Sequence, residues 1–211
     1  MKPNIIIVMT DQQRHDLRKA AGFQLDTMPF LDSWAQEGVD FVQAYTSNPT
    51  CMPARTSMFT GRYTQSHQVR TNHNAIDAVY TKDLLDVLKE EGYTTAICGK
   101  NHTYRKVQDF DYYDTNGHLG VEGQQMLSDE EAKLDEFLKS LKFIDSDVPA
   151  PGDVRAQLPY RNVSSVFRFI DEQKTSEKPF FAWVSIAEPH NPYQVPAPYF
   201  DMFPPDEIPP T

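Results

Sequence analysis

An uninterrupted apolar segment near the start of the chain, residues 5–9 with the sequence Ile-Ile-Ile-Val-Met, restricts the possible folds most strongly. No polar residue alternates with these mostly β-branched side chains, which is typical of a strand buried on both faces of a parallel sheet. Further strand-like segments alternate with amphipathic helix-like segments along the chain. The sequence therefore predicts an α/β fold with a mostly parallel sheet and helices on both of its faces.

The same patterns predict where the elements lie. Residues 101–123 have no sustained period and are expected to form a long surface excursion, and the proline-containing segments 148–159 and 188–211 are expected to be irregular. Ser128 and Glu131 have the spacing of a capping box, and Asn162 is expected to cap the next helix. We expect strands at 4–9, 39–45, 93–98 and 180–187, and helices at 27–38, 53–59, 81–92, 128–141 and 162–170.

Composition and charge argue against several classes of partner. The 211 residues include 39% apolar ones, which is enough for a core, and carry a net charge of −10 without any Lys- or Arg-rich run. Nucleic acid and anionic membrane are therefore not expected partners. The longest apolar run predicts neither a transmembrane helix nor a signal peptide. As written, the sequence is expected to be cytoplasmic, or periplasmic or secreted where a leader has been removed.

Residues that bind metals, anions or protons follow each predicted strand. In an α/β sheet, ligands bind beyond the carboxyl ends of the strands, so these residues are expected to converge. Their types indicate an anionic ligand that is handled together with a metal. They are Asp11 and Gln12, Cys51 with Arg55, Lys100 with His102, and His190.

A specific motif occupies residues 51–62, with the sequence Cys-Met-Pro-Ala-Arg-Thr-Ser-Met-Phe-Thr-Gly-Arg. This segment resembles the sulfatase signature, Cys-x-Pro-x-Arg followed by a short helix and Thr-Gly-Arg. Three further motifs stand in the order that the family uses: Thr-Asp-Gln at 10–12, Gly-Lys-x-His at 99–102 and Pro-His-x-Pro at 189–192. Nearly the whole chain thus resembles the formylglycine-dependent sulfatases of the alkaline-phosphatase-like superfamily.

This resemblance implies roles for five residues. A maturation enzyme would oxidise Cys51 to formylglycine, whose hydrated aldehyde is the nucleophile, and Arg55 would hold the modified residue. Lys100 would bind the sulfate, and His102 would contact the hydrated aldehyde. His190 would lie near the leaving-group oxygen, where an imidazole is suited to act as a general acid and to bind substrate. The residue between Lys100 and His102, and the residues after His102, differ from the Lys-Trp-His-Leu-Gly pattern that many relatives have. The sequence therefore does not predict how the side chains pack around these two residues.

The resemblance also implies a calcium site. Asp11, Gln12 and the oxygen at position 51 would be its ligands, and a glutamine in place of the more frequent second aspartate removes one charge. The alternative for Asp11 is a turn cap after the strand. Asn72 lies where some relatives contact the sulfate or the substrate, and a plain turn residue is an equal alternative. His67, His73 and His118 could line a pocket, whereas Cys98 is interpreted as a structural thiol.

The remaining metal ligands of the family and its second sulfate-binding lysine have no match in the sequence. We therefore expect residues 1–211 to be the N-terminal part of a sulfatase catalytic domain, lacking the rest of that domain and a C-terminal subdomain, and to hold calcium only weakly. The substrate expected from the resemblance is an aryl or carbohydrate sulfate ester. A phosphonate or phosphate monoester hydrolase of the same superfamily and a noncatalytic truncated homologue are the alternatives, and the oligomeric state stays open.

Overall fold

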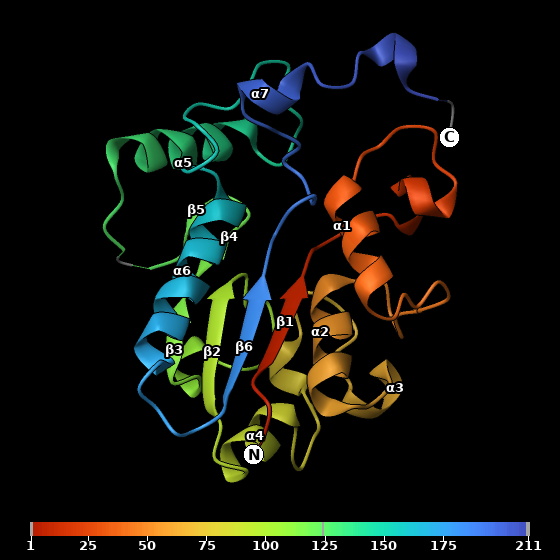
Figure 1. The fold of residues 1–211 in the computed structure, drawn as a ribbon. Coiled ribbons are helices and arrows are strands. Elements are labelled where there is room, and N and C mark those ends of the chain that lie inside the picture. The colour runs from red at the N-terminus through yellow and green to blue at the C-terminus, as the bar shows by residue number, and fades with distance from the viewer. Residues whose placement is uncertain (1, 124, 210–211) are drawn as a thin grey trace.

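A parallel sheet of four strands, in the order β1-β6-β2-β3, forms the centre of the computed structural model, which describes residues 2–123 and 125–209 (Figure 1). Each neighbouring pair in this sheet is parallel, as the sequence predicts. The strands are β1 (Ile5–Met9), β2 (Thr94–Gly99), β3 (Tyr112–Asp114) and β6 (Phe180–Ser185), and the hairpin strands β4 (Asn116–Gly117) and β5 (Gly120–Val121) form a separate antiparallel pair.

Helices connect the strands and cover both faces of the sheet. The α-helices are α1 (Pro29–Trp34), α2 (Cys51–Thr60), α3 (Thr64–His67), α4 (Leu84–Glu90), α5 (Asp129–Leu141), α6 (Leu158–Gln173) and α7 (Ala197–Phe200). Short 3₁₀ turns lie at His15–Leu17, Lys19–Ala21, Ala35–Glu37, Ala75–Asp77, Val107–Asp109 and Pro205–Glu207.

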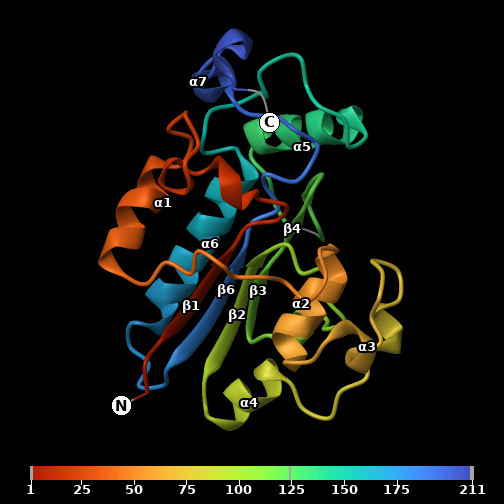
Figure 2. The same cartoon turned by 90° about the vertical axis from the view of Figure 1, so that its right-hand side faces the viewer.

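Two apolar clusters hold the layers together. Phe59 of α2 and Leu85 of α4 pack with Trp183 on one face of the sheet. On the other face, Phe169 of α6 packs with Ala182 of the same central strand. Figure 2 shows α2 and α4 on one side of the sheet and α6 on the other. The prediction of helices on both faces is confirmed, because successive side chains of β6 point to opposite faces and are buried on each.

The outer strand β1 is less covered than its sequence predicts. Ile5 and Ile7 pack against the cluster around Phe59, but Ile6 is 48% exposed and Val8 57% exposed. Within the described residues, β1 pairs only with β6. The prediction that β1 is buried on both faces is therefore wrong: one face is covered, and the other is open.

The predicted strand at residues 39–45 is also wrong. These residues form turns and irregular backbone, and Phe41 is 77% exposed and Tyr45 87% exposed. Their aromatic and β-branched side chains indicate a strand, but a strand also needs a neighbour, and no described segment pairs with this one. The chain passes from α1 to α2 without adding to the sheet.

Two boundaries differ from prediction further along. Asn162 does not cap a helix, because α6 already begins at Leu158 with Pro159 in its first turn, and Asn162 is buried inside it, where its side-chain oxygen accepts a hydrogen bond from Asn116 Nδ2 at 2.9 Å. Residues 101–123 are not only a surface excursion: they contain β3 and the β4–β5 hairpin. Strands of two or three residues are too short for a period to reveal them.

The remaining predicted elements are found close to their expected places. Ser128 and Glu131 form the predicted capping box at the start of α5. Leu134 and Leu138 of this helix pack with Leu158 in a third cluster beyond the ends of the strands. In the part of the chain that the structure describes, no helix is both long and apolar enough to cross a membrane.

Candidate active site

The first turn of α2 lies at the carboxyl ends of β1, β2 and β6, and Cys51 is its first residue. The thiol of Cys51 lies 3.5 Å from Oδ1 of Asp11, which follows β1. Asn72 accepts a hydrogen bond from the Met52 amide at 2.9 Å and so fixes this turn. Because Pro53 has no N–H and the Met52 amide is already bonded, the helix start offers fewer free donors to an anion than its position predicts.

Three charged side chains are buried together beside Cys51. Asp11 Oδ2 accepts hydrogen bonds from Lys100 Nζ and, at 3.4 Å, from Arg55 Nη2. All three residues are less than 10% exposed. Burial opposes ionisation of Asp11, but the hydrogen bond from Lys100 and the charges of Lys100 and Arg55 outweigh it and hold the pKa of Asp11 below its usual value. The cluster thus contains two cations and one carboxylate, an excess of one positive charge in a buried position.

Arg55 is fixed on every side. Its Nη1 donates to Ser185 Oγ at 2.6 Å and to the Lys100 carbonyl at 3.3 Å, and its guanidinium lies 5.3 Å from the centre of the Trp183 ring. A planar guanidinium held in this way keeps its charge and direction without further reorganisation. Sequence reasoning missed Ser185, although a polar residue that ends an otherwise apolar strand at this edge of the sheet is a usable signal.

Close approach of the backbone places Lys100 beside Arg55. Gly99 ends β2 with a φ of 102°, and a Cβ at this position would lie 2.1 Å from the Ser185 carbonyl oxygen. Only glycine therefore fits between β2 and β6 here. The Lys100 amide then donates to the same Ser185 carbonyl at 2.8 Å, which turns the lysine side chain toward Asp11.

Three histidines surround Lys100. Burial and the nearby cations lower the pKa of His102 to about 4 and that of His118 to about 3, so both rings are neutral at pH 7. His118 Nε2 lies 2.7 Å from Lys100 Nζ and accepts its hydrogen, so the ring proton of His118 is on Nδ1. Its ring packs on that of His190 with centroids 4.0 Å apart. Of the three histidines considered as pocket residues from sequence, His118 is the one that joins the cluster.

His190 is oriented by its own backbone neighbourhood. Its Nδ1 lies 2.7 Å from the carbonyl oxygen of Asn191. Since a carbonyl can only accept, Nδ1 carries the hydrogen and Nε2 is the nitrogen that can exchange a proton. Asn191 in turn donates to the Phe143 carbonyl at 2.6 Å, which connects this loop to the segment after α5. The structure therefore brings His190 to the same group of side chains as Lys100.

The described residues do not by themselves form a calcium site. No group of three or more His, Cys, Asp or Glu side chains among residues 2–123 and 125–209 is arranged to hold a metal. The carboxylate of Asp11 already faces Lys100 and Arg55. Gln12 is exposed, and its amide nitrogen donates to the Tyr193 hydroxyl at 3.1 Å. One carboxylate shared with two cations is too little for a cation that takes six to eight oxygen ligands.

Glu188, two residues before His190, is a second buried carboxyl near the site. Its Oε2 has no hydrogen-bond partner among the described residues. Burial raises the pKa of Glu188 to about 7. No sequence motif singled out this residue, because burial without a partner depends on the packing of distant segments.

This raised pKa predicts how stability changes with pH. Between the ordinary glutamate pKa of 4.5 and about 7, the folded chain keeps a proton on Glu188 that the unfolded chain releases. The stabilisation is therefore fully present below pH 4.5 and is lost as the pH rises to about 7. The glutamine of Glu188→Gln cannot ionise. We therefore expect the difference in the free energy of unfolding, variant minus wild type, to be roughly 1–3 kcal/mol larger at pH 8 than at pH 5. Urea unfolding at both pH values measures this difference, and parallel pH profiles would contradict it.

A family model named Sulfatase matches residues 3–208, which is nearly all of the chain. The chain belongs to the sulfatase family. Cys51, which begins α2, is the first residue of the segment that resembles the family signature. The fold is accordingly that of the alkaline-phosphatase-like superfamily, with a parallel sheet between layers of helices.

Individual relatives agree with this assignment. The sulfatase chain is 30% identical to an arylsulfatase from Clostridium perfringens, over 99% of this chain and 48% of that protein. It is also 30% identical to an ulvan-active sulfatase from Formosa agariphila, over 98% of this chain and 39% of that protein. A crystal structure of a phosphonate monoester hydrolase of Agrobacterium radiobacter is similar with a TM-score of 0.74 and 26% identity, over 99% of this chain and 45% of that one. The chain thus spans less than half the length of these relatives.

Proposed function

We propose that the protein containing this chain hydrolyses an organic sulfate monoester, with Cys51 converted to formylglycine as its nucleophile. The observation that carries the proposal is the position of Cys51, at the start of α2 and 3.5 Å from Asp11, beside the buried cations Lys100 and Arg55. On this proposal, residues 1–211 are the N-terminal part of the catalytic domain.

The charge of the cluster supports a singly charged substrate. Lys100, Arg55 and Asp11 together leave one positive charge, which a sulfate monoester balances with its single negative charge. Against these three side chains alone, without a metal, a phosphate monoester with close to two negative charges at pH 7 would leave one of them uncompensated. A phosphonate monoester has the same single charge as a sulfate monoester, and the likeness to a phosphonate monoester hydrolase keeps it as the second candidate. The sulfatase relatives favour the sulfate ester.

Each surrounding residue has a proposed task. Formylglycine would supply a hydrated aldehyde, whose oxygen is a stronger nucleophile than water and which can release sulfate without a second attack on sulfur. Arg55 would hold this residue and favour its ionised form. Lys100 would bind the sulfate oxygens, and neutral His102 would contact the hydrated aldehyde. In its doubly protonated form, His190 would donate the Nε2 proton to the leaving-group oxygen, while the Nδ1 hydrogen stays on the Asn191 carbonyl. Asn72 would support the start of α2 beside the substrate.

Calcium is proposed only with additional ligands. Asp11 is the one carboxylate that the described cluster offers, and Gln12 and position 51 are the nearby oxygen-bearing candidates. A calcium ion at Asp11 would therefore need oxygen ligands beyond those of the described residues, and it would compete with Lys100 for the carboxylate.

Mass spectrometry and turnover test the proposed function together. We expect the tryptic peptide of residues 20–55 to show an aldehyde in place of the Cys51 thiol when the natural protein is produced with a formylglycine-generating enzyme. The same preparation should hydrolyse 4-nitrophenyl sulfate faster than an aryl phosphonate monoester, whereas protein made without the maturation enzyme should keep the thiol and be inactive. An unmodified, inactive protein in the presence of the maturation enzyme would favour a noncatalytic homologue. Faster turnover of the phosphonate would reverse the order of the two candidates.

A further inference from the structure

His118 lies outside the four motifs that resemble the sulfatase family, and the proposed mechanism gives it no task. It nevertheless touches two residues that have one. Its Nε2 lies 2.7 Å from Lys100 Nζ, and its ring lies on that of His190, with centroids 4.0 Å apart and an angle of 32° between the ring planes. A single side chain thus contacts both the proposed sulfate-binding residue and the proposed general acid.

The hairpin that carries His118 is fixed to the helices beside it. Gly120 has a φ of 107°, and a Cβ at this position would overlap the carboxylate of Asp135 in α5. The Val121 amide donates to Asp135 Oδ2 at 2.9 Å, and Arg161 of α6 donates to Asp135 Oδ1 at 2.8 Å. Asp135 and Arg161 are both buried. The turn between β4 and β5, which contains His118, therefore cannot move without disturbing a buried ion pair.

The contact with Lys100 fixes the position of its ammonium group. Lys100 is only 3% exposed, and its Nζ donates one hydrogen to Asp11 Oδ2 and another to His118 Nε2. Two hydrogen bonds in different directions hold a flexible lysine side chain, whereas a single one would let it swing about the carboxylate. The tetrahedral geometry of the ammonium then sets the direction of its third hydrogen, which is the one left for a sulfate oxygen.

A histidine suits this position because its ring is neutral. Burial and the charge of Lys100 lower the pKa of His118 to about 3. Its Nδ1 has no hydrogen-bond partner among the described residues, so no carboxylate there favours a second proton on the ring. A cationic side chain at this position would repel Lys100, and a carboxylate would neutralise the charge that the cluster offers to an anion. A neutral acceptor holds Lys100 and leaves its charge available.

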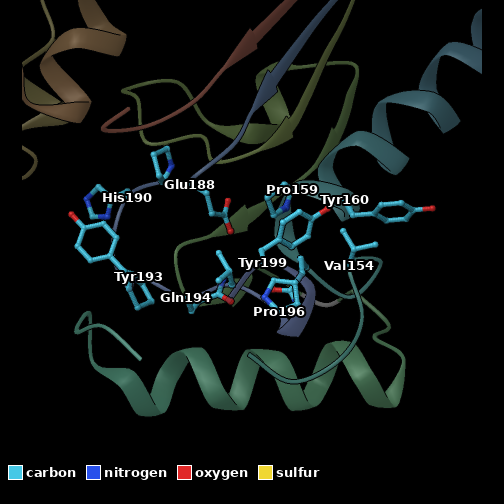
Figure 3. Close-up of a pocket in the computed structure, with 13 residues that line it drawn as sticks. Val154, Pro159, Tyr160, Glu188, His190, Tyr193, Gln194, Pro196 and Tyr199 are labelled. Carbon is cyan, nitrogen blue, oxygen red and sulfur yellow. The ribbon is translucent and has the colours of Figure 1, made fainter. Parts of the chain in front are cut away.

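The contact with His190 restrains the plane of that ring. The Asn191 carbonyl lies 2.7 Å from His190 Nδ1, which fixes one atom and leaves the ring free to tilt. His190 also borders a mainly apolar cavity of about 360 Å³, and Figure 3 shows His190 and Tyr193 at one end of it. Open space does not restrain a ring. The stacked ring of His118, itself packed against Phe143 with centroids 6.0 Å apart, therefore keeps His190 in its orientation.

We propose that His118 is a positioning residue, which holds the ammonium of Lys100 and the imidazole of His190 at fixed places relative to each other. In a sulfate ester, the sulfur and the leaving-group oxygen share one bond, so the two residues that act on them have to be placed together. A ring that contacts both residues and is carried by an anchored hairpin meets this need. The inference rests on the proposed sulfatase function and deepens it, because it adds to the site a residue that no motif indicates.

Two substitutions separate the two contacts of His118. His118→Phe keeps a ring on His190 and removes the acceptor for Lys100, whereas His118→Gln keeps an acceptor and removes the ring. In the matured natural protein, His118→Phe should raise KM about tenfold for both 4-nitrophenyl sulfate and phenyl sulfate, and should change kcat less than about threefold. His118→Gln should lower kcat about tenfold for phenyl sulfate, whose leaving group needs a proton, and less than about twofold for 4-nitrophenyl sulfate, whose leaving group does not.

Binding of inorganic sulfate gives a measurement that needs no turnover. In the Cys51→Ala form of the natural protein, calorimetric titration with sodium sulfate should show about tenfold weaker binding when His118→Phe is added. Adding His118→Gln should weaken binding less than about twofold. The exposed His15→Phe is the matched control, and it should leave sulfate binding, KM and kcat unchanged.

A purely structural role of His118 would give a different result. It would lower the melting temperature and reduce kcat for both esters in the same proportion; this outcome, or unchanged constants in both variants, would overturn the proposal. Partial unfolding does not hide the answer, because KM and the ratio of kcat between the two esters do not depend on the folded fraction. If matured wild type hydrolyses neither ester, the sulfatase function fails, and the sulfate affinities still decide whether His118 positions Lys100. Absence of both turnover and sulfate binding would contradict both proposals.

Discussion

Replacing Cys51 with alanine is expected to lower the turnover of 4-nitrophenyl sulfate by matured protein by roughly 10⁴-fold or more, while the fold stays intact. The substitution removes the precursor of the proposed nucleophile, and loss of a nucleophile typically has an effect of this size. Alanine is a good helix former at the first position of α2, and the thiol makes only a 3.5 Å contact with Asp11. The melting temperature should therefore change little. Activity of Cys51→Ala within tenfold of wild type would contradict covalent catalysis at this position.

Cys98→Ala is the matched control for this experiment. Cys98 is fully buried on β2 among apolar side chains of the α6 face, and burial raises the pKa of its thiol to about 11. Its removal leaves a small cavity, so the free energy of unfolding should fall by about 1 kcal/mol. Turnover should be kept. Replacing Cys51 is thus expected to lower activity with little change in stability, and replacing Cys98 is expected to lower stability and keep activity.

Asp11→Asn is expected to lower the free energy of unfolding at pH 7 by about 3 kcal/mol and turnover by roughly 10³-fold. The asparagine has nearly the same shape but no charge, so Lys100 and Arg55 are left as buried cations without a counter-ion. Breaking a buried ion pair by removing one partner typically costs 3–5 kcal/mol. Urea unfolding and 4-nitrophenyl sulfate turnover measure the two effects.

A double variant separates the role of Asp11 in stability from its role in activity. Adding Lys100→Met to Asp11→Asn removes one of the two uncompensated charges and should restore a substantial part of the lost stability. Turnover should fall further, since Lys100 is the proposed sulfate-binding residue. If the double variant is less stable than Asp11→Asn alone, Lys100 stabilises the fold by packing, and the charge argument is wrong.

Features encoded by short segments were predictable from the sequence. The capping box at Ser128 and the apolar face of α5 involve residues three or four apart, so local spacing is sufficient to find them. The position of Cys51 at a helix start follows from Pro53 in the first turn. Strand order was not needed to expect Asp11 near Lys100, because all parallel strands end at the same edge.

Features that depend on contacts between distant segments could not be predicted. Residues 39–45 have the composition of a strand, but whether a strand forms depends on a neighbour that local sequence does not specify. Of the histidines at the site, His118 is brought there by a hairpin of two-residue strands. Among the described residues Glu188 Oε2 has no hydrogen-bond partner, and this depends on how α6 and the segment after β6 pack together.

The incomplete cover of β1 has a consequence for the order of the charge cluster. Asp11 lies two residues after this strand, whereas Lys100 follows β2 and Arg55 is held at the end of the fully buried β6. Segments with few buried contacts open locally at a lower free energy than central strands. If β1 detached from β6, Asp11 would move away with it, and the two cations would stay. A contact that covers Ile6 and Val8 would stabilise β1 in the sheet. Asp11 would then neutralise Lys100 for a larger fraction of the time. A contact on the open face would in this way lower the positive charge that a substrate meets at the far end of the strand.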